Sequence, residues 1–260
     1  MRELQELIDE PRIIVIGGQA VAFWYRELSR RDYLSGERLA PLTSQDIDFR
    51  GARRSVERAA ALLDGEAKLP TMDDHTPSTG IVLFTDSRGH RRQIDFVDAP
   101  YGLSARDVAD TAQHVVLPGG RGKETSALLI HPERLMESRV HNVIGLGQDR
   151  AQAIGQLRAA IECAGAFTRL VLDADEPGPV VRRRAVLKLN ERIYRFSRRP
   201  HARRLFRERG INTFDAVVSD HPGLPTKFRE VRYPQMRAQL AELPERRKLG
   251  STSPAGISKL

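Results

Sequence analysis

Three aspartates occupy equivalent places in two short segments whose hydrophobic residues alternate. In "QDIDFRG", Asp46 and Asp48 alternate with Ile47 and Phe49, so a strand there places both carboxylates on one face. Asp95 repeats the pattern in "QIDFVD". Carboxylates that share a face repel one another unless a cation lies between them, and Mg²⁺ prefers oxygen ligands. Three such acids on neighbouring strands predict a site for two Mg²⁺ or Mn²⁺ ions, the arrangement that serves in-line phosphoryl or nucleotidyl transfer.

The alternative for these acids is a solvated face of an edge sheet, which needs no metal. The segment "RIIVIGGQAVAFWYRE" favours the metal. Its β-branched run ends at Gly17 and Gly18, where a helical pattern begins. Small residues at such a turn let backbone N–H groups approach a phosphate at the helix N-terminus. A strand-to-helix turn without any ligand is the simpler interpretation of the same glycines.

The glycine turn, "SQDIDF" and "QIDFVD" together resemble the nucleotidyltransferase superfamily of the polymerase-β type, over residues 12–145. Within it, the chain is most similar to the AbiEii-like (type IV toxin) and related minimal nucleotidyltransferases. Those proteins share a long loop between the glycines and the paired acids, and a later segment like "HPERLMESRVHN". Residues after 150 match no family.

This resemblance implies which residues contact the nucleotide phosphates. Gly17, Gly18 and Ser44 match the family's phosphate-binding positions. Arg139 lies on a helix where the family often carries a lysine near the triphosphate. Its place beside the apolar stripe of that helix is also compatible with a structural ion pair, and the sequence leaves both roles open. Gln19 departs from the Gly, Ser or Thr that is commoner there.

The resemblance also assigns the three acids. Asp46 and Asp48 would hold both metal ions. Asp95 would complete one metal site and accept the proton of the attacking hydroxyl. All three carboxylates are present, so the resemblance implies an intact catalytic centre.

Hydrophobic periodicity predicts an α+β fold of the nucleotidyltransferase type, a mixed sheet flanked by helices and followed by an all-helical C-terminal domain. Turn formers and helix caps set the limits of each element. The predicted strands are 12–17, 45–51, 80–86, 91–99 and 124–130. The predicted helices are a short one within 1–12, then 18–31, 53–65, 104–112, 131–146, 150–165, 180–199 and 200–210, with shorter helical pieces to about 243.

The change from mixed to purely helical patterns near residue 150 predicts two domains and a tail. Residues 1–148 would form the catalytic domain and residues 149–243 a basic helical domain. Residues 244–260 are polar and rich in Gly, Ser and Pro, which predicts a disordered tail. The active site would lie in the cleft between the two domains.

Charge predicts the class of partner. The chain of 260 residues carries 42 Lys and Arg against 34 Asp and Glu, a net charge of +8, which favours polyanions such as nucleic acid. The residues 182–209, called the basic run below, contain twelve Lys or Arg and two Glu. An ordinary solvated helix face is the alternative. The residues predicted to bind RNA phosphates are Arg183, Arg184, Arg198 and Arg199.

These observations predict an enzyme that transfers a nucleoside monophosphate from an NTP to an acceptor hydroxyl and releases pyrophosphate. The basic run favours RNA as the acceptor, and the resemblance implies a tRNA 3′ end and a toxin with a cognate antitoxin. The alternative acceptors are a small molecule such as an antibiotic, or a protein hydroxyl. A non-enzymatic alternative is an inactive homologue that binds nucleic acid.

Composition also predicts the compartment. A single cysteine, Cys163, excludes an internal disulfide and a cysteine-based metal cluster. No apolar run approaches the length of a membrane span, and the first twelve residues lack the apolar centre of a signal peptide. We therefore expect a cytoplasmic protein that does not enter the membrane.

Overall fold

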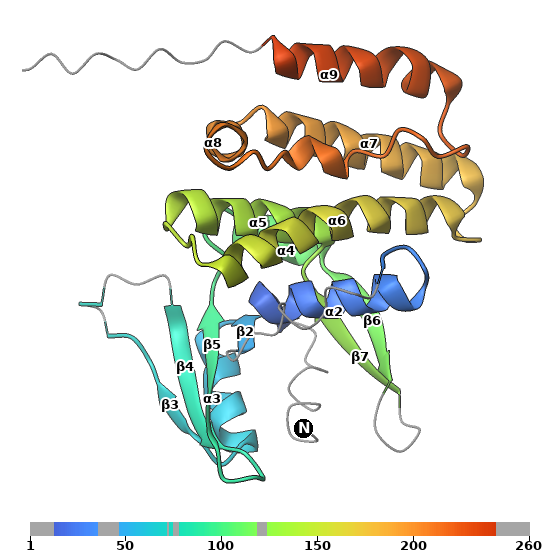
Figure 1. Cartoon of the computed structure of the whole chain (residues 1–260). Helices are drawn as coiled ribbons and strands as arrows, with labels where there is room; N and C mark the ends of the chain where they lie inside the picture. Colours follow the sequence, from blue (N-terminus) through green and yellow to red (C-terminus); the bar gives the residue numbers. More distant parts are fainter. Residues whose placement is uncertain (1–12, 36–46, 72, 75–77, 119–123, 243–260) are drawn as a thin grey trace, which may run out of the picture.

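The computed structural model of this chain contains one mixed sheet of seven strands (Figure 1). It describes residues 13–35, 47–71, 73–74, 78–118 and 124–242. The strand order is β3-β4-β5-β2-β1-β7-β6. The strands are β1 (Ile14–Val15), β2 (Ile47–Arg50), β3 (Glu66–Lys68), β4 (Ser78–Thr85), β5 (Arg91–Val97), β6 (Gln113–Pro118) and β7 (Glu124–Leu129).

The helices lie against the sheet and above it. They are α2 (Gly17–Arg30), α3 (Arg53–Leu62), α4 (Ala105–Thr111), α5 (Pro132–Gly145), α6 (Ala151–Asp173), α7 (Pro179–Ser197), α8 (Pro200–Arg209) and α9 (Tyr233–Ala241). A 3₁₀ turn at Thr213–Ala216 follows α8, and a π-helical turn at Phe228–Arg232 leads into α9. The predicted α+β class is therefore confirmed, and the described residues after 150 contain helices and no strands.

Two strands, β3 and β6, are missing from the sequence-based prediction. Each lies at an edge of the sheet and pairs antiparallel with a single neighbour, β3 with β4 and β6 with β7. The three residues of β3, "EAK", carry no hydrophobic alternation. Such a strand forms because a neighbour offers its backbone groups, which a local pattern does not reveal.

The centre of the sheet sets the positions of the two acidic segments. Strand β2 lies between β1, to which it is antiparallel, and β5, to which it is parallel. In that register Asp48 is the partner of Asp95, and Phe49 is the partner of Phe96. The two phenylalanines are buried on the face covered by α3. The two aspartates therefore lie side by side on the opposite face, which α2 covers.

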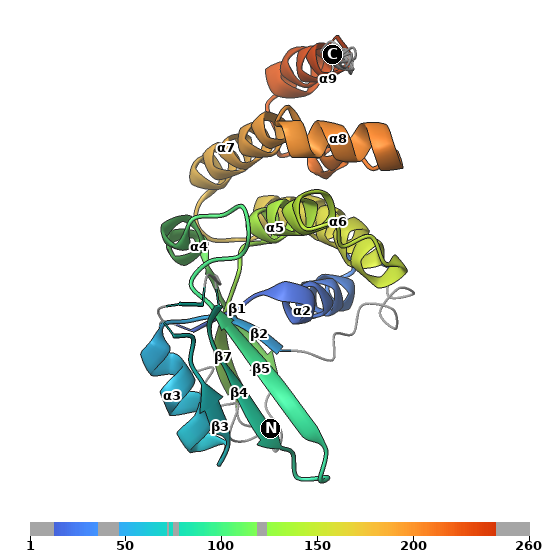
Figure 2. The same cartoon turned by 90° about the vertical axis from the view of Figure 1, so that its left-hand side faces the viewer.

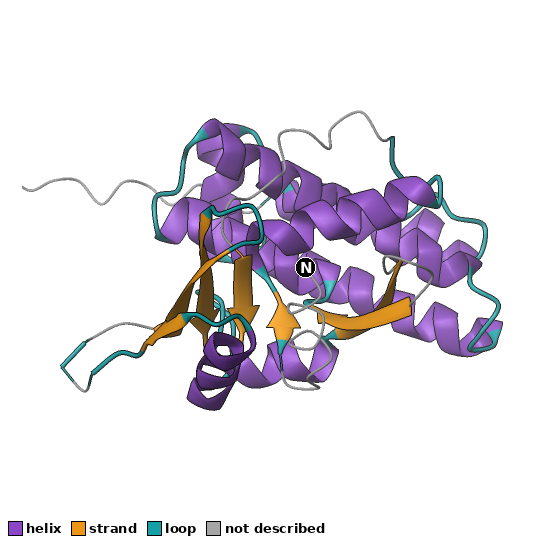
Figure 3. Ribbon diagram, turned by 90° about the horizontal axis from the view of Figure 1, so that it is seen from below, coloured by secondary structure: helices purple, strands orange, loops and turns teal. Residues whose placement is uncertain are grey.

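The molecule is built in layers, which Figure 2 shows from the sheet through α2, then α5 and α6, then α7 and α8, to α9. Figure 3, seen from below, shows the strands in a row across the molecule with the larger group of helices behind them. A small core around Val56, Ile94 and Phe96 lies between the sheet and α3. A much larger one fills the space between the sheet and the helical layers.

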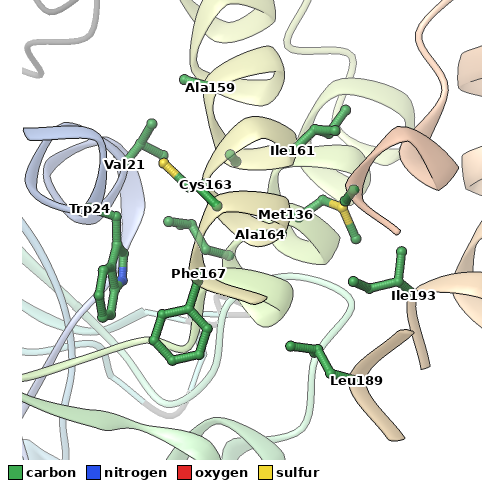
Figure 4. Packing of buried hydrophobic residues seen from close by; sticks show 14 of the residues in the cluster. Val21, Trp24, Met136, Ala159, Ile161, Cys163, Ala164, Phe167, Leu189 and Ile193 are labelled. Carbon is green, nitrogen blue, oxygen red and sulfur yellow. The ribbon is translucent and has the colours of Figure 1, made fainter. Parts of the chain in front are cut away.

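Helix α6 is the centre of that larger core. Phe167 of α6 packs edge-on against Trp24 of α2, with ring centroids 5.4 Å apart, and α7 contributes Leu189 and Ile193 (Figure 4). Cys163 is buried in the same layer, and burial raises the pKa of its thiol. The cysteine is therefore a core residue.

The predicted boundary at residue 148 lies between α5 and α6. The larger core is continuous across it and runs from Ile14 to Met236. The division into domains stays a prediction, and the tail 244–260 lies outside the described residues. Among the described residues, no helix is long and apolar enough to cross a bilayer.

Candidate functional site

The first helix begins at a glycine that packs directly against an acidic side chain. Gly17 has φ +67°, a left-handed backbone conformation that side chains disfavour. A Cβ atom at this position would overlap the carboxylate of Asp48 on β2. Helix α2 has no side-chain hydrogen bond at its N-cap, Ile16. The glycine is thus required because it lets β2 bring a carboxylate onto the N-terminus of α2, where a helix exposes unpaired N–H groups.

We expect Gly17→Ala to lower the free energy of unfolding by more than the strain of its φ angle alone. That strain costs about 1–2 kcal/mol, and displacing Asp48 adds an overpacking cost of roughly 1–3 kcal/mol. Gly89→Ala is the matched control, because Gly89 has φ +81° with open space around it. Urea unfolding of both variants measures the difference. Equal losses would show that Asp48 is not held against Gly17.

The cross-strand partner of Asp48 supplies a second carboxylate on the same face. Gln93 Nε2 donates to Asp95 Oδ1 at 2.7 Å, which orients that side chain from two residues away on β5. Neighbouring strands lie about 4.8 Å apart, so the two acids are close enough to share a cation. Asp46 and Ser44 lie outside the described residues.

The donor chemistry of Asp48 and Asp95 fits a hard divalent cation, which prefers carboxylate oxygens. Within the described ranges, no group of three or more His, Cys, Asp or Glu is arranged to hold a metal. A predicted three-carboxylate site needs Asp46, so it stays a prediction. The structure brings together the two acids that it describes.

An arginine from a distant helix enters the same site. Arg139 of α5 donates from Nη1 to Gln156 Oε1 of α6 at 3.2 Å. In the amide orientation that satisfies both groups of Asn142, the amide oxygen accepts from Arg139 Nη2 at 2.9 Å. Burial lowers the pKa of the Arg139 guanidinium, and the charge of Asp48 raises it. The arginine is therefore held by neutral amides and faces the carboxylate.

Arg139 has no ion pair within 4 Å among the residues that the structure describes, and its buried Nε has no hydrogen-bond partner there. Arg134, one turn earlier on α5, is different: its Nη1 lies 2.8 Å from Glu137 Oε2. A buried cation normally has a charged partner close by, because desolvation is costly. An arginine that lines an open pocket and has no charged partner close by is suited to bind an anionic ligand.

Gly17, Gly18, Asp48 and Arg139 all line one pocket of about 700 Å³. Its walls come from both sides of residue 148. They include residues that the sequence analysis did not select, namely Tyr101, Ser138, Asn142, Gln148, Arg150, Gln152 and Gln156. Ser138 and Asn142 lie in the segment "HPERLMESRVHN", and the others belong to no motif. Only the tertiary structure shows that all of them line the same pocket as the glycine turn.

The basic run lies outside this pocket, since none of its residues lines it. Ion pairs with described residues engage several of its cations, namely Arg192, Arg195, Arg204, Arg207 and Arg209. Arg192 holds the fully buried Glu133 of α5 at 2.7 Å. A part of the run is therefore structural, which the charge count alone did not reveal.

The four arginines predicted to bind RNA are all exposed on and just beyond α7. Arg183 Nε donates to the carbonyl oxygen of Gly223 at 3.0 Å, and Arg198 lies over the ring of Tyr194 at 5.6 Å. Arg183 and Arg198 are about 22 Å apart along the helix at 1.5 Å per residue. The four side chains thus form two pairs at the ends of one helix, compatible with an extended polyanion.

Neither a protein-family model nor a curated protein sequence matches the chain. Among solved structures, it is similar to an antigenic nucleotidyltransferase-like protein from Paracoccidioides brasiliensis. The identity is 15% and the TM-score 0.37, over 72% of this chain and 89% of that one. It is also similar to JHP933 from Helicobacter pylori, with 12% identity and a TM-score of 0.36, over 93% of this chain and 90% of that one. Similarity at this level carries no argument about function, so any proposed function must rest on the geometry of the site.

Proposed function

We propose that this protein is a metal-dependent nucleotidyltransferase that moves a nucleoside monophosphate from an NTP to an acceptor hydroxyl. The observation that carries the proposal is Arg139, a partly buried cation that has no ion pair within the described part of the chain and lines the same open pocket as Asp48, the cross-strand partner of Asp95. A pocket with a cation on one wall and adjacent carboxylates on the other suits a polyphosphate and its divalent metal.

Each wall of the pocket has its own task in this proposal. The N-terminus of α2 at Gly17 and Gly18 binds phosphate oxygens through backbone N–H groups, a role that the family resemblance also gives to Ser44. Arg139 neutralises the triphosphate. Asp48 and Asp95 hold Mg²⁺ or Mn²⁺ together with Asp46. When bound, the metal supplies charge stabilisation for the phosphoryl oxygens.

The proposed reaction is a single displacement at the α-phosphorus. A bond forms between the acceptor oxygen and the α-phosphorus, and the bond from that phosphorus to the bridging oxygen of the β-phosphate breaks. Pyrophosphate leaves with the electron pair, and the proton of the acceptor hydroxyl passes to Asp95. Arg139 then stabilises the charge that develops on the leaving pyrophosphate.

The decisive experiment incubates the purified protein with each NTP, Mg²⁺ and total cellular RNA. With radiolabel in the α-phosphate we expect labelled RNA, and with radiolabel in the γ-phosphate we expect labelled pyrophosphate only. Chelation of the metal abolishes both signals. Transfer of label to small molecules or to protein, with none in RNA, would move the acceptor to those classes. No transfer and no NTP binding would overturn the proposal.

We infer further that the acceptor is RNA. The four exposed arginines at the ends of α7 support this, together with the net charge of the chain. The resemblance to AbiEii-like toxins narrows the acceptor to a tRNA 3′ end and adds a cognate antitoxin as a partner. Separation of the labelled RNA by size tests the tRNA assignment.

Reversing Arg183, Arg184, Arg198 and Arg199 to glutamate is expected to weaken RNA binding and flatten its salt dependence. Each lost phosphate contact lowers the slope of log affinity against log salt by about 0.7–0.9. Binding of the NTP stays unchanged, because its pocket lies elsewhere. Filter binding at several salt concentrations measures both. An unaltered salt slope would return these arginines to an ordinary solvated face.

A further inference from the structure

A second pocket, of about 760 Å³, opens between α8, the 3₁₀ turn and α9. Its volume is within the range of small-molecule sites, about 300–1,000 Å³. Phe214 and Tyr233 form part of its wall, with ring centroids 5.4 Å apart and planes 13° apart. We call it the α8–α9 pocket.

Cations surround the aromatic wall of this pocket. Arg203 and Arg207 of α8 and Arg237 of α9 line it, and Asp215 is its one acidic lining residue. Burial raises the pKa of Asp215, and the charge of Arg237 lowers it. The lining therefore carries three arginines and one aspartate, a balance of charge that favours an anionic ligand.

Phe206 of α8 also lines the pocket, and 57% of it is exposed to solvent. It stands between Arg203 and Arg207 in the sequence, so the ring and the cations share one short segment of helix. A large exposed ring among arginines is costly unless it contacts a partner. Rings interleaved with cations are the pattern that binds unstacked bases and the phosphates beside them.

The same helix reaches the first pocket. Arg209, at the end of α8, lies 3.6 Å from Asp149, and Asp149 lines the pocket that holds Asp48 and Arg139. Phe206 precedes Arg209 by three residues, about one turn of helix, or roughly 5 Å along the axis. Figure 2 shows α8 directly above α5 and α6, between them and α9. Phe206 thus lies one helical turn from the arginine that contacts Asp149 at the rim of the first pocket.

We propose that the α8–α9 pocket binds one nucleotide of a single-stranded nucleic acid whose end enters the first pocket. This inference rests on the proposed function, which makes the first pocket the site of nucleotidyl transfer. The base stacks on Phe206, and the adjoining phosphate pairs with Arg207 and Arg237. A duplex keeps its bases stacked on one another and hides their faces, so the pocket selects single strands.

The test measures binding of a short, unstructured, fluorescently labelled RNA by anisotropy. We expect Phe206→Ala to weaken binding about tenfold without changing the salt slope, since stacking releases no counterion. We expect Arg207→Ala to weaken binding and to lower the salt slope by about 0.7. The matching RNA duplex binds more weakly than the single strand, and its binding is insensitive to Phe206→Ala.

Two controls separate the pocket from general surface effects. Val116→Ala removes an exposed apolar side chain from the edge strand β6, 58% exposed. Arg204→Ala removes an exposed arginine of α8 that contacts Glu208, as Arg207 does, but does not line the pocket. Both controls should bind RNA nearly as the parent does. Equal losses in Arg204→Ala and Arg207→Ala, or full binding by Phe206→Ala, would overturn the pocket assignment.

The same variants distinguish this inference from the proposed function. Binding of Mg²⁺–NTP is measured in parallel, and it should be unaltered by Phe206→Ala and Arg207→Ala. If the parent protein binds RNA but no NTP, and both variants lose RNA binding, the nucleic-acid pocket stands and the transferase is overturned. Intact NTP binding and transfer with no effect of either variant would overturn the pocket alone. If an acidic, aromatic peptide displaces the RNA and binds more tightly, the pocket is a peptide site instead.

Discussion

Asp48→Asn is expected to reduce nucleotidyl transfer about a thousandfold, because a metal ion at this position contributes several kcal/mol of transition-state stabilisation. The fold should survive, because asparagine has nearly the same size and shape as aspartate. Asp48 and Asp95 are cross-strand partners on one face, so neutralising one of them relieves repulsion. The label-transfer assay and urea unfolding measure the two effects separately.

Two further variants make this prediction specific. Asp95→Asn should lose a comparable part of the activity, because it removes the other member of the pair. Asp110→Asn serves as the control, since Asp110 lies on α4 in an exposed ion pair with Arg106 and does not line the pocket. Full activity of Asp48→Asn with Mg²⁺ would falsify the metal assignment, and the acids would then be a solvated sheet face.

Arg139→Met is expected to weaken NTP binding about tenfold to a hundredfold, the loss of one charge-assisted hydrogen bond to a phosphate. The free energy of unfolding should stay the same or rise, because a partly buried cation that has no ion pair with any described residue is costly to the unliganded fold. Arg139→Lys should recover part of the affinity, since it keeps the charge but loses the planar fork of donors. Titration with a fluorescent NTP and thermal unfolding measure both quantities.

The matched control for this prediction is Arg134→Met on the same helix. Arg134 is partly buried and paired with Glu137, so its loss should destabilise the protein and leave NTP binding intact. The two variants thus separate the alternatives that the sequence leaves open for Arg139. If Arg139→Met destabilises the fold and binds NTP normally, Arg139 is a structural residue and Asp48 is its partner.

Some of the site was predictable because it depends on neighbours in the chain. Alternation in "QDIDFRG" and "QIDFVD" places each aspartate opposite a buried residue, and the structure buries Phe49, Ile94 and Phe96 as that pattern requires. Glycines after a β-branched run predict the strand-to-helix turn at Gly17. These features follow from backbone geometry and local hydrophobicity, so they need no knowledge of distant contacts.

The charge of the basic run was predictable, and its use was not. A count of residues shows an excess of cations, but Arg192 is matched to Glu133 on α5, 59 positions away. Arg209 likewise forms an ion pair with Asp149, which lies in the connection between α5 and α6. Whether a cation faces solvent or a carboxylate depends on helix packing, which sequence separation hides.

The sequence by itself determined the α+β class, most of the elements, the shared face of the acids and the cationic character of α7 and α8. Only the tertiary structure decided that Asp48 is the cross-strand partner of Asp95, that Gly17 lacks a side chain to admit Asp48, and that Arg139 and Asp48 line one pocket. The reason is physical. Local periodicity fixes the direction in which a side chain points within its own strand or helix. Strand order and helix packing fix which residues that side chain contacts, because the buried core joins residues far apart in the chain.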